Sequence, residues 1–164
     1  MSNIAILGSG GWGMALAVAF DKQGHKISLW SKFKSEVDAL NQTRSNENLL
    51  KGIVLSDSIL ITNDITVSSD ADIVIIAVPS FAVRSTVAKL KNIVKQDTVI
   101  VNVSKGFEPD SFKRLSVVIS EELPQNPVVV LSGPSHAEEV AVGVPTSLVA
   151  ACTDYAISQY VQDE

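Results

Sequence analysis

The sequence has little cysteine, few aromatic residues and no excess of positive charge. Among its 164 residues Cys152 is the only cysteine, so no internal disulfide is possible and a reducing compartment is expected. The 13 Lys and Arg residues are outnumbered by 18 Asp and Glu residues, and a net charge of −5 argues against nucleic acid as a partner. Aromatic residues make up 5%, while Val, Ile, Leu and Ala are frequent, which favours buried β-branched strands over an aromatic-rich sandwich.

Long apolar runs and recognisable targeting segments are also missing. The longest nearly apolar stretch, residues 14–20, is far shorter than the roughly 20 residues that a membrane helix needs. A strand-like run begins at Asn3, which leaves no room for a targeting peptide. No set of His, Cys and Asp residues has the spacing of metal ligands, and no G-x-S-x-G nucleophile elbow occurs. We therefore expect a cytoplasmic protein with no stable membrane insertion and no metal site.

Apolar patterning divides the chain into strands that alternate with helices. Apolar, largely β-branched runs predict strands at 3–7, 25–30, 58–62, 71–79, 97–104, 127–133 and 145–151. Helices are predicted at 11–23, around Val37 and Leu40, at 83–94, at 112–123 and after a cap at Thr153. Such alternation implies βαβ crossovers. We expect one α/β domain over 1–164, with a Rossmann-type doubly wound, mostly parallel sheet and helices on both faces.

Gly8, Gly10 and Gly13 form a G-x-G-x-x-G pattern between the first predicted strand and the first predicted helix. In this context Gly8 permits the tight turn, Gly10 lets the backbone approach a pyrophosphate, and Gly13 lets the helix pack closely on the strand. Free N–H groups and the positive end of the helix dipole then face the phosphates. The pattern predicts a dinucleotide-binding domain over 1–164; the alternative is a glycine-rich turn without a ligand.

The residues after the second strand bear on which dinucleotide binds. In NAD-binding domains an acidic residue about 20 positions beyond the glycine loop holds the ribose hydroxyls. Here Lys32 and Lys34 stand in that region, and no carboxylate occurs until Glu36. Because a cation suits a 2′-phosphate, we hypothesise that NADPH is accepted at least as well as NADH. The alternative is that both lysines are ordinary solvated side chains.

Two further motifs follow predicted strands. Lys105 comes directly after a buried strand, and ligands in open α/β sheets bind outside the carboxyl ends of strands, in the same crevice as the glycine loop. Its ammonium would neutralise a substrate phosphate or polarise a carbonyl; the alternative is a surface lysine in a turn. Gly133 and Ser135 follow another strand and lead into a helix. There Ser135 and Glu138 would form a capping box, or the exposed amides would receive an anion.

Four segments of the chain form a recognisable set. They are the G-x-G-x-W-G loop followed by Met-Ala-Leu-Ala, "VPS" at 78–80, "SKGFE" at 104–108 and "LSGPSHAEEVAVGVPT" at 131–146. In order and spacing this set resembles the N-terminal domain of the bacterial NAD(P)-dependent glycerol-3-phosphate dehydrogenase family, over essentially the whole chain. The resemblance implies reversible hydride transfer between NAD(P)H and dihydroxyacetone phosphate, which gives sn-glycerol 3-phosphate for phospholipid synthesis.

The resemblance also implies roles for individual residues. Beside the three glycines of the loop, it implies cofactor contacts for Gly11, Trp12, Lys32, Pro79, Lys105 and Ala137. It implies substrate contacts for Lys105, Gly133 and Ser135. The indole of Trp12 would lie over the cofactor or close the crevice; the alternative is that it packs under a neighbouring loop. The family's general acid or base is a lysine of a C-terminal helical domain, so no catalytic residue is expected within 1–164.

The chain departs from the family pattern at two places. Residues 49–52 read Leu-Leu-Lys-Gly, where the family usually has an aromatic residue followed by Leu-Pro-Gly. The C-terminal helical domain is absent from this chain, so we expect a fragment that binds NAD(P)H and has almost no turnover by itself. The alternatives are a non-catalytic dinucleotide-sensing module and a related two-domain dehydrogenase that acts on a hydroxy acid or a sugar nucleotide. Whether the full-length protein is a homodimer is left open.

Overall fold

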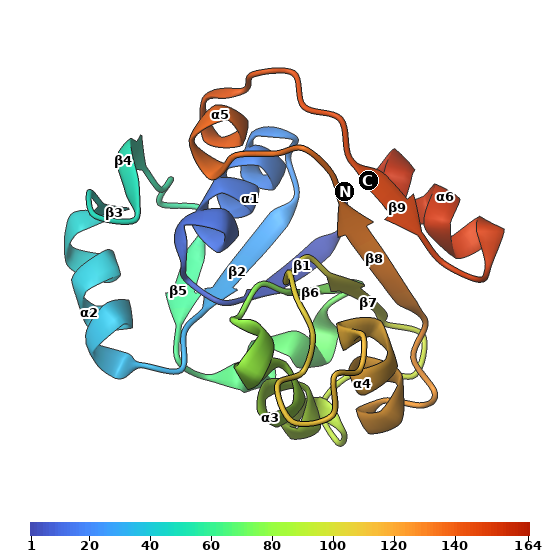
Figure 1. Cartoon of the computed structure of the whole chain (residues 1–164). Coiled ribbons are helices and arrows are strands. Elements are labelled where there is room, and N and C mark those ends of the chain that lie inside the picture. Colours follow the sequence, from blue (N-terminus) through green and yellow to red (C-terminus); the bar gives the residue numbers. More distant parts are fainter.

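Seven strands form the central sheet of the computed structural model, which describes residues 1–164. Their order is β5-β2-β1-β6-β7-β8-β9, and every neighbouring pair is parallel except β8 and β9. The strands are β1 (Asn3–Leu7), β2 (Lys26–Trp30), β5 (Leu60–Thr62), β6 (Ile73–Ile76), β7 (Val99–Asn102), β8 (Val128–Ser132) and β9 (Val149–Ala151). The chain proceeds outward from β1 to β5 and then returns to β6 on the other side of β1 (Figure 1). The expected doubly wound, mostly parallel sheet is confirmed.

Helices cover both faces of this sheet (Figure 1). One core contains side chains of α1 (Gly11–Lys22), α2 (Lys34–Thr43), α5 (Ala137–Val142) and α6 (Tyr155–Asp163). The other contains side chains of α3 (Val83–Val87), the 3-10 turn η3 (Ala88–Leu90) and α4 (Leu115–Glu122). Two more 3-10 segments, η1 (Ile65–Asp70) and η2 (Ser80–Ala82), flank β6.

Neighbouring residues of the central strands point to opposite faces of the sheet. In β1, Ile4 and Ile6 belong to one core, whereas Ala5 and Leu7 belong to the other, and all four are buried. Because both faces are covered, such a strand is apolar at every position rather than at every second one. This explains why the strands appear in the sequence as unbroken runs of apolar residues.

Helix boundaries differ from the sequence expectations at three places. The helix predicted over 83–94 is α-helical for only five residues and continues as the 3-10 turn η3. The helix predicted over 112–123 begins later, since Phe112 has a positive φ of 54°, which no α-helical residue adopts. The cap predicted at Thr153 is wrong: the Asp154 carboxylate accepts hydrogen bonds from two first-turn amides of α6. A carboxylate one position later satisfies those amides directly.

An antiparallel hairpin of β3 (Ser45–Asn46) and β4 (Leu50–Val54) was not predicted from the sequence. It follows α2, which ends where Arg44 adopts the left-handed conformation with φ 53°. Charged and polar residues interrupt this stretch without regular alternation, so it lacks the period-2 signal of a strand. The side chain of Leu50 is buried in the core on the α1 side, which holds the hairpin close to the start of α1.

The two ends of the chain lie together at the amino edge of the sheet (Figure 1). Ser2, directly before β1, donates a 2.7 Å hydrogen bond from its hydroxyl to the Glu164 carboxylate. The glycine loop follows β1 and therefore lies at the opposite, carboxyl edge. None of the helices combines the length and the apolar character needed to span a bilayer.

Candidate functional site

The glycine loop leaves β1 and turns directly into α1. Gly8 has φ 128°, and its N–H donates a 2.9 Å hydrogen bond to the carbonyl of Trp30 at the end of β2. A Cβ at Gly8 would lie 2.3 Å from the Ala77 carbonyl oxygen, and one at Gly13 would lie 1.9 Å from the Gly8 carbonyl oxygen. Both separations are far inside van der Waals contact, so only glycine fits at these positions. The structure thus shows the tight turn at Gly8 and the close helix packing at Gly13.

Gly10 differs from these two, because a Cβ there would meet no atom within 4 Å. It is the N-cap of α1, with φ −69° and ψ 173°, and no side chain caps this helix. The first hydrogen bond of the helix runs from the Met14 N–H to the Gly10 carbonyl at 2.9 Å. The amides of Gly11, Trp12 and Gly13 therefore have no partner within the helix. Open space beside unpaired amides at a helix N-terminus fits the pyrophosphate of a dinucleotide.

The β3–β4 hairpin lies against the glycine loop. A Cβ at Gly11 would lie 2.5 Å from the Leu49 carbonyl oxygen, so the backbones of the two segments are in close contact. Trp12 is half-buried and packs against the core on the α1 side, and its indole N–H donates to no protein group. One portion of the Trp12 side chain is thus packed on the protein, and the rest is accessible.

The ends of β6 and β7 are tied together beside this loop. The Ser104 hydroxyl lies within hydrogen-bond distance of two carbonyl oxygens, those of Ile76 (3.1 Å) and Val78 (2.6 Å). Since Ala77 contacts Gly8, this hydroxyl links the "SKGFE" motif to the glycine loop through the end of β6. Two motifs that are far apart in the sequence thus lie next to the same strand end.

Lys105 projects from the segment that follows β7. It is exposed and forms no ion pair, which leaves its ammonium available to an anion. Gly106 beside it has φ 100°, and a Cβ there would lie 3.7 Å from the Ser80 side chain. Pro79, which precedes Ser80, is also exposed. The "VPS" and "SKGFE" motifs therefore meet at this edge of the sheet.

The motif after β8 packs against α1 through α5, but without the expected cap. The capping box predicted for Ser135 and Glu138 is wrong, because His136 is the N-cap of α5 and no side chain caps the helix. Ser135 stands one residue too early, and its hydroxyl lies 3.5 Å from the Gly133 carbonyl oxygen instead. Gly133, Ser135 and Ala137 are each half-buried.

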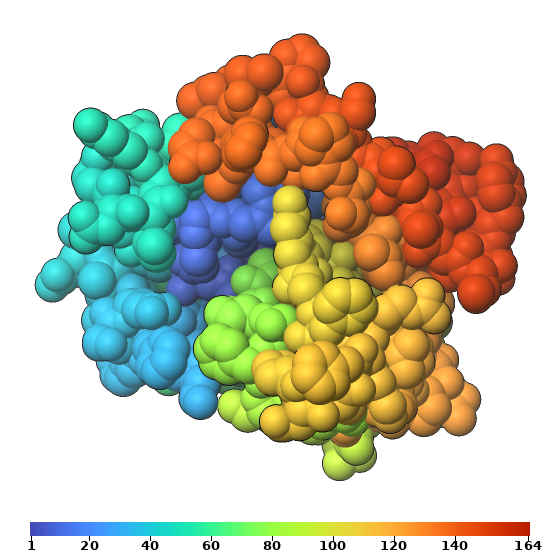
Figure 2. Space-filling view, viewed as in Figure 1, coloured from blue at the N-terminus to red at the C-terminus, as the bar shows by residue number.

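These segments surround a hollow on one face of the molecule (Figure 2). Its floor is the blue segment that contains the glycine loop. Its rim includes the cyan hairpin, the orange α5, and the green and yellow segments that follow β6 and β7. A slender part of the yellow segment extends across the hollow toward α5. The predicted cofactor and substrate residues of the glycine loop and of the segments after β6, β7 and β8 therefore belong to parts of the chain that border a single hollow.

The two lysines after β2 have different surroundings. Lys34 forms an ion pair with Asp38 at 2.7 Å. Lys32 has no carboxylate partner, and its ammonium lies 5.8 Å from the centre of a neighbouring aromatic ring. The sequence showed Glu36 only as the first carboxylate after β2, and in the structure this carboxylate accepts a 2.9 Å hydrogen bond from Ser9 in the glycine loop. Of the charged side chains after β2, Glu36 therefore contacts the loop directly.

A cluster of ion pairs connects the segment after β7 to α3 and α4. Arg84 of α3 binds the Glu108 carboxylate through two hydrogen bonds, of 2.6 and 2.9 Å. The same guanidinium contacts Glu121 and Glu122 of α4, each at 2.8 Å. It lowers the pKa of Glu108 from 4.5 to about 2, with help from a neighbouring serine hydroxyl. Sequence reasoning missed this cluster because its members lie up to 38 residues apart and have no local spacing signal.

Replacing Arg84 with methionine is expected to lower the stability of the chain at neutral pH, and this loss should shrink in acid. Because the pKa of Glu108 is lower in the folded state, its ion pair contributes fully above pH 4.5 and is lost as pH falls toward about 2. The measurement is the difference between the urea denaturation midpoints of wild type and Arg84→Met, taken at several pH values from 7 to 2. Lys95→Met is the control, since its exposed 3.6 Å pair with Asp70 stands apart from the cluster. A midpoint difference for Arg84→Met that is constant from pH 7 to pH 2 would contradict the prediction.

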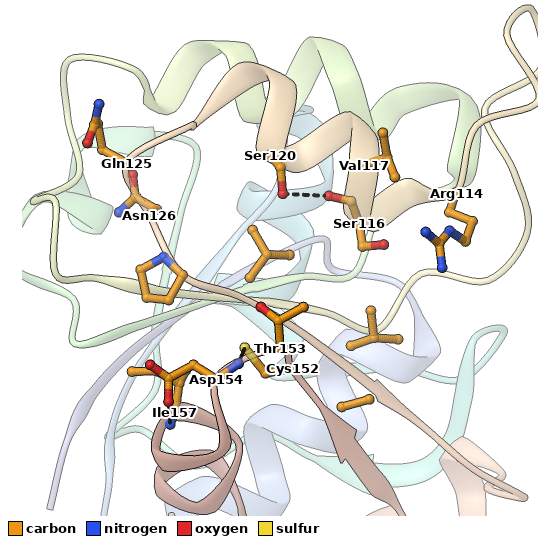
Figure 3. Close-up of a pocket in the computed structure, with 14 residues that line it drawn as sticks. Arg114, Ser116, Val117, Ser120, Gln125, Asn126, Cys152, Thr153, Asp154 and Ile157 are labelled. Carbon is orange, nitrogen blue, oxygen red and sulfur yellow. Dashed lines mark hydrogen bonds between the residues drawn. The ribbon is translucent and has the colours of Figure 1, made fainter.

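A separate groove of about 730 Å³ lies between α4 and α6, over β8 and β9 (Figure 3). Its lining consists of Arg114, Ser116, Val117, Ser120, Gln125, Asn126, Pro127, Val128, Val130, Ala151, Cys152, Thr153, Asp154 and Ile157. None of the predicted site residues is among them. The hydroxyl of Ser120 is already bonded to the Ser116 carbonyl at 3.0 Å. The groove contributes nothing to the site at the glycine loop.

The fold and the hollow define a dinucleotide-binding α/β domain. The strand order reverses between β1 and β6. In open α/β sheets, ligands bind at such a point of reversal, outside the carboxyl ends of the strands. The glycine turn, the open space at Gly10 and the unpaired amides of α1 lie at that point.

Comparisons with known proteins identify the family. The family described as NAD-dependent glycerol-3-phosphate dehydrogenase N-terminus matches residues 3–158, and the chain belongs to it. Glycerol-3-phosphate dehydrogenase [NAD(P)+] of Desulfitobacterium hafniense is 44% identical over 163 residues, which are 99% of this chain and 46% of that protein. The crystal structure of glycerol-3-phosphate dehydrogenase from Coxiella burnetii is 32% identical, with a TM-score of 0.91 over 99% of this chain and 50% of that one. The chain thus spans about half the length of these relatives.

Proposed function

We propose that this chain binds NADPH or NADH in the hollow and forms the cofactor-binding half of a cytoplasmic glycerol-3-phosphate dehydrogenase. The observation that carries the proposal is the glycine loop, where unpaired amides of α1 border open space at Gly10. Bound NAD(P)H supplies the hydride that reduces a ketone. The backbone of Gly11 and the accessible part of Trp12 hold the dinucleotide from one side, and Lys32 lies toward its adenosine ribose. Pro79, Lys105 and Ala137 line the remainder of its path.

The proposed substrates are dihydroxyacetone phosphate and sn-glycerol 3-phosphate, the pair that the names of the relatives imply. Lys105 supports this assignment, because an exposed ammonium without an ion pair attracts a phosphate or a developing alkoxide. Gly133 and Ser135 belong to the segment between β8 and α5, and we assign them to the part of the substrate site that this chain supplies. We expect the general acid or base of the reaction to lie outside residues 1–164.

Two measurements test the proposal. Titration of the 164-residue chain with NADH and NADPH, followed by nicotinamide fluorescence, should show saturable binding without turnover of dihydroxyacetone phosphate. A chimera that adds the C-terminal half of the Desulfitobacterium hafniense relative should oxidise NADH when dihydroxyacetone phosphate is supplied. A chimera that folds and binds NADH but reduces no phosphorylated ketone would favour a dinucleotide-sensing module. Reduction of a keto acid instead would favour a related dehydrogenase.

Replacing Lys32 with glutamate should weaken NADPH binding about five- to tenfold and change NADH binding much less. The reason is that the substitution places a carboxylate where a 2′-phosphate needs a cation. Fluorescence titrations of both nucleotides with wild type and Lys32→Glu give the two ratios. Lys34→Glu is the matched control, since Lys34 is already engaged by Asp38. Unchanged NADPH affinity in Lys32→Glu would show that Lys32 is an ordinary solvated side chain.

A further inference from the structure

Glu36 is held against the glycine loop by two serine hydroxyls. It is the third residue of α2, and its Oε2 accepts hydrogen bonds from Ser9 Oγ at 2.9 Å and from Ser31 Oγ at 2.5 Å. Ser9 stands between Gly8 and Gly10, and Ser31 directly follows β2. Both serines are buried, with 6% and 3% of their surface exposed. The carboxylate is therefore fixed at the junction of the loop and the end of β2.

The same carboxylate has an unused oxygen and an unbalanced charge. Both hydrogen bonds end on Oε2, and Oε1 has no protein partner. The nearest lysines along the chain do not neutralise it, because Lys34 binds both oxygens of Asp38 and Lys32 lies by an aromatic ring. Glu36 is itself an exposed residue. An anchored carboxylate with one unpaired oxygen is a preorganised hydrogen-bond acceptor for a hydroxyl group.

The position of this carboxylate matches a known requirement of dinucleotide recognition. In such folds an acidic side chain at the end of the second strand accepts hydrogen bonds from the adenosine ribose hydroxyls, and its charge repels a 2′-phosphate. No acid stands at the end of β2 here. The first turn of α2 brings Glu36 back to the same place, and Ser9 and Ser31 hold it there.

We propose that Glu36 determines how far this chain discriminates between NADH and NADPH. Its free oxygen accepts a hydrogen bond from a ribose hydroxyl, and its charge lowers the affinity for NADPH that Lys32 would otherwise confer. This inference rests on the proposed binding of a nicotinamide dinucleotide. It assigns the choice of cofactor to a pair of opposite charges, Lys32 and Glu36, rather than to Lys32 alone.

Glu36→Gln tests the inference, since an amide oxygen still accepts from Ser9 and Ser31 while the charge is removed. The Kd for NADPH should fall about tenfold, and the Kd for NADH should change by less than about threefold. Asp97→Asn is the matched control: it changes the net charge equally, but Asp97 is exposed, forms no ion pair and precedes β7 at the amino edge of the sheet. It should alter neither Kd.

The possible outcomes separate this inference from the proposed function. If wild type and Glu36→Gln bind both nucleotides with the same ratio of affinities, Glu36 does not discriminate, although dinucleotide binding stands. If wild type binds neither nucleotide, the proposed function fails and the inference fails with it. Should Glu36→Gln not fold, Ser31→Ala takes its place, because it loosens the carboxylate without removing it. Ser31→Ala should raise relative NADPH affinity about two- to threefold, and an unchanged ratio would count against the inference.

Discussion

Replacing Gly13 with alanine should lower the free energy of unfolding by about 3 kcal/mol or more. The added Cβ would lie 1.9 Å from the Gly8 carbonyl oxygen, and this neighbour is backbone that is itself fixed against Ala77. Neither α1 nor β1 can move away without disturbing the core that both build. Urea denaturation followed by circular dichroism measures the loss.

The control for Gly13→Ala is an alanine at a glycine that has room for it. Gly24 follows the C-cap of α1 with φ 91° and has no atom within 4 Å of an added Cβ, so alanine there meets only the strain of a left-handed backbone. That strain costs roughly 1–2 kcal/mol. An equal or smaller loss in Gly13→Ala than in Gly24→Ala would show that the close approach of α1 to the loop is not what requires glycine.

Replacing Gly10 with valine should have the opposite consequence: dinucleotide binding is lost and the fold is retained. Valine would occupy the open space beside the unpaired amides of Gly11 and Trp12, where the pyrophosphate is proposed to lie. Loss of about two charge-assisted hydrogen bonds corresponds to a Kd increase of about 100-fold or more. Fluorescence titration with NADH and NADPH provides the measurement.

The fold of Gly10→Val is checked separately. The backbone of Gly10, with φ −69° and ψ 173°, suits any residue, and a Cβ there meets no atom within 4 Å. The free energy of unfolding should therefore change by no more than about 1 kcal/mol, the usual scale for a change at a helix N-cap. Unchanged nucleotide affinity in a folded Gly10→Val protein would place the pyrophosphate elsewhere and remove the main support for the proposed function.

The sheet could be predicted from the sequence because its central strands are buried on both faces. β6 is apolar at every position and β1 at all but its first, and the segment that follows β6 has buried apolar residues at helical spacing. Both patterns are visible in the sequence without tertiary information. The β3–β4 hairpin was not predictable in this way. Its charged and polar residues obey no period, and its place is fixed by the contact of Leu49 with Gly11 and the burial of Leu50, which only the folded chain reveals.

The parts of the candidate site that could be predicted are those whose residues directly follow a strand in the sequence. The glycine loop and Lys105 follow strands directly, so their positions at the carboxyl edge follow from the topology. The contacts of Glu36 with Ser9 and of Arg84 with Glu108 join residues 27 and 24 positions apart, and no spacing rule indicates them. The capping box at Ser135 failed for a different reason, since four residues separate β8 from α5 and the last of them, His136, is the N-cap.

The hydrogen bond between Ser2 and Glu164 has a practical consequence for anything attached to the last residue. It fixes Glu164 at the amino edge of the sheet, and the five residues of β1, about 17 Å of strand, separate that edge from the glycine loop. A tag, a surface tether or a fluorescent protein joined after Glu164 would therefore leave the mouth of the hollow uncovered. The same geometry sets the reach required of a linker in the chimera. The linker must run from the amino edge of the sheet to its carboxyl edge before the added C-terminal half can cover the nucleotide.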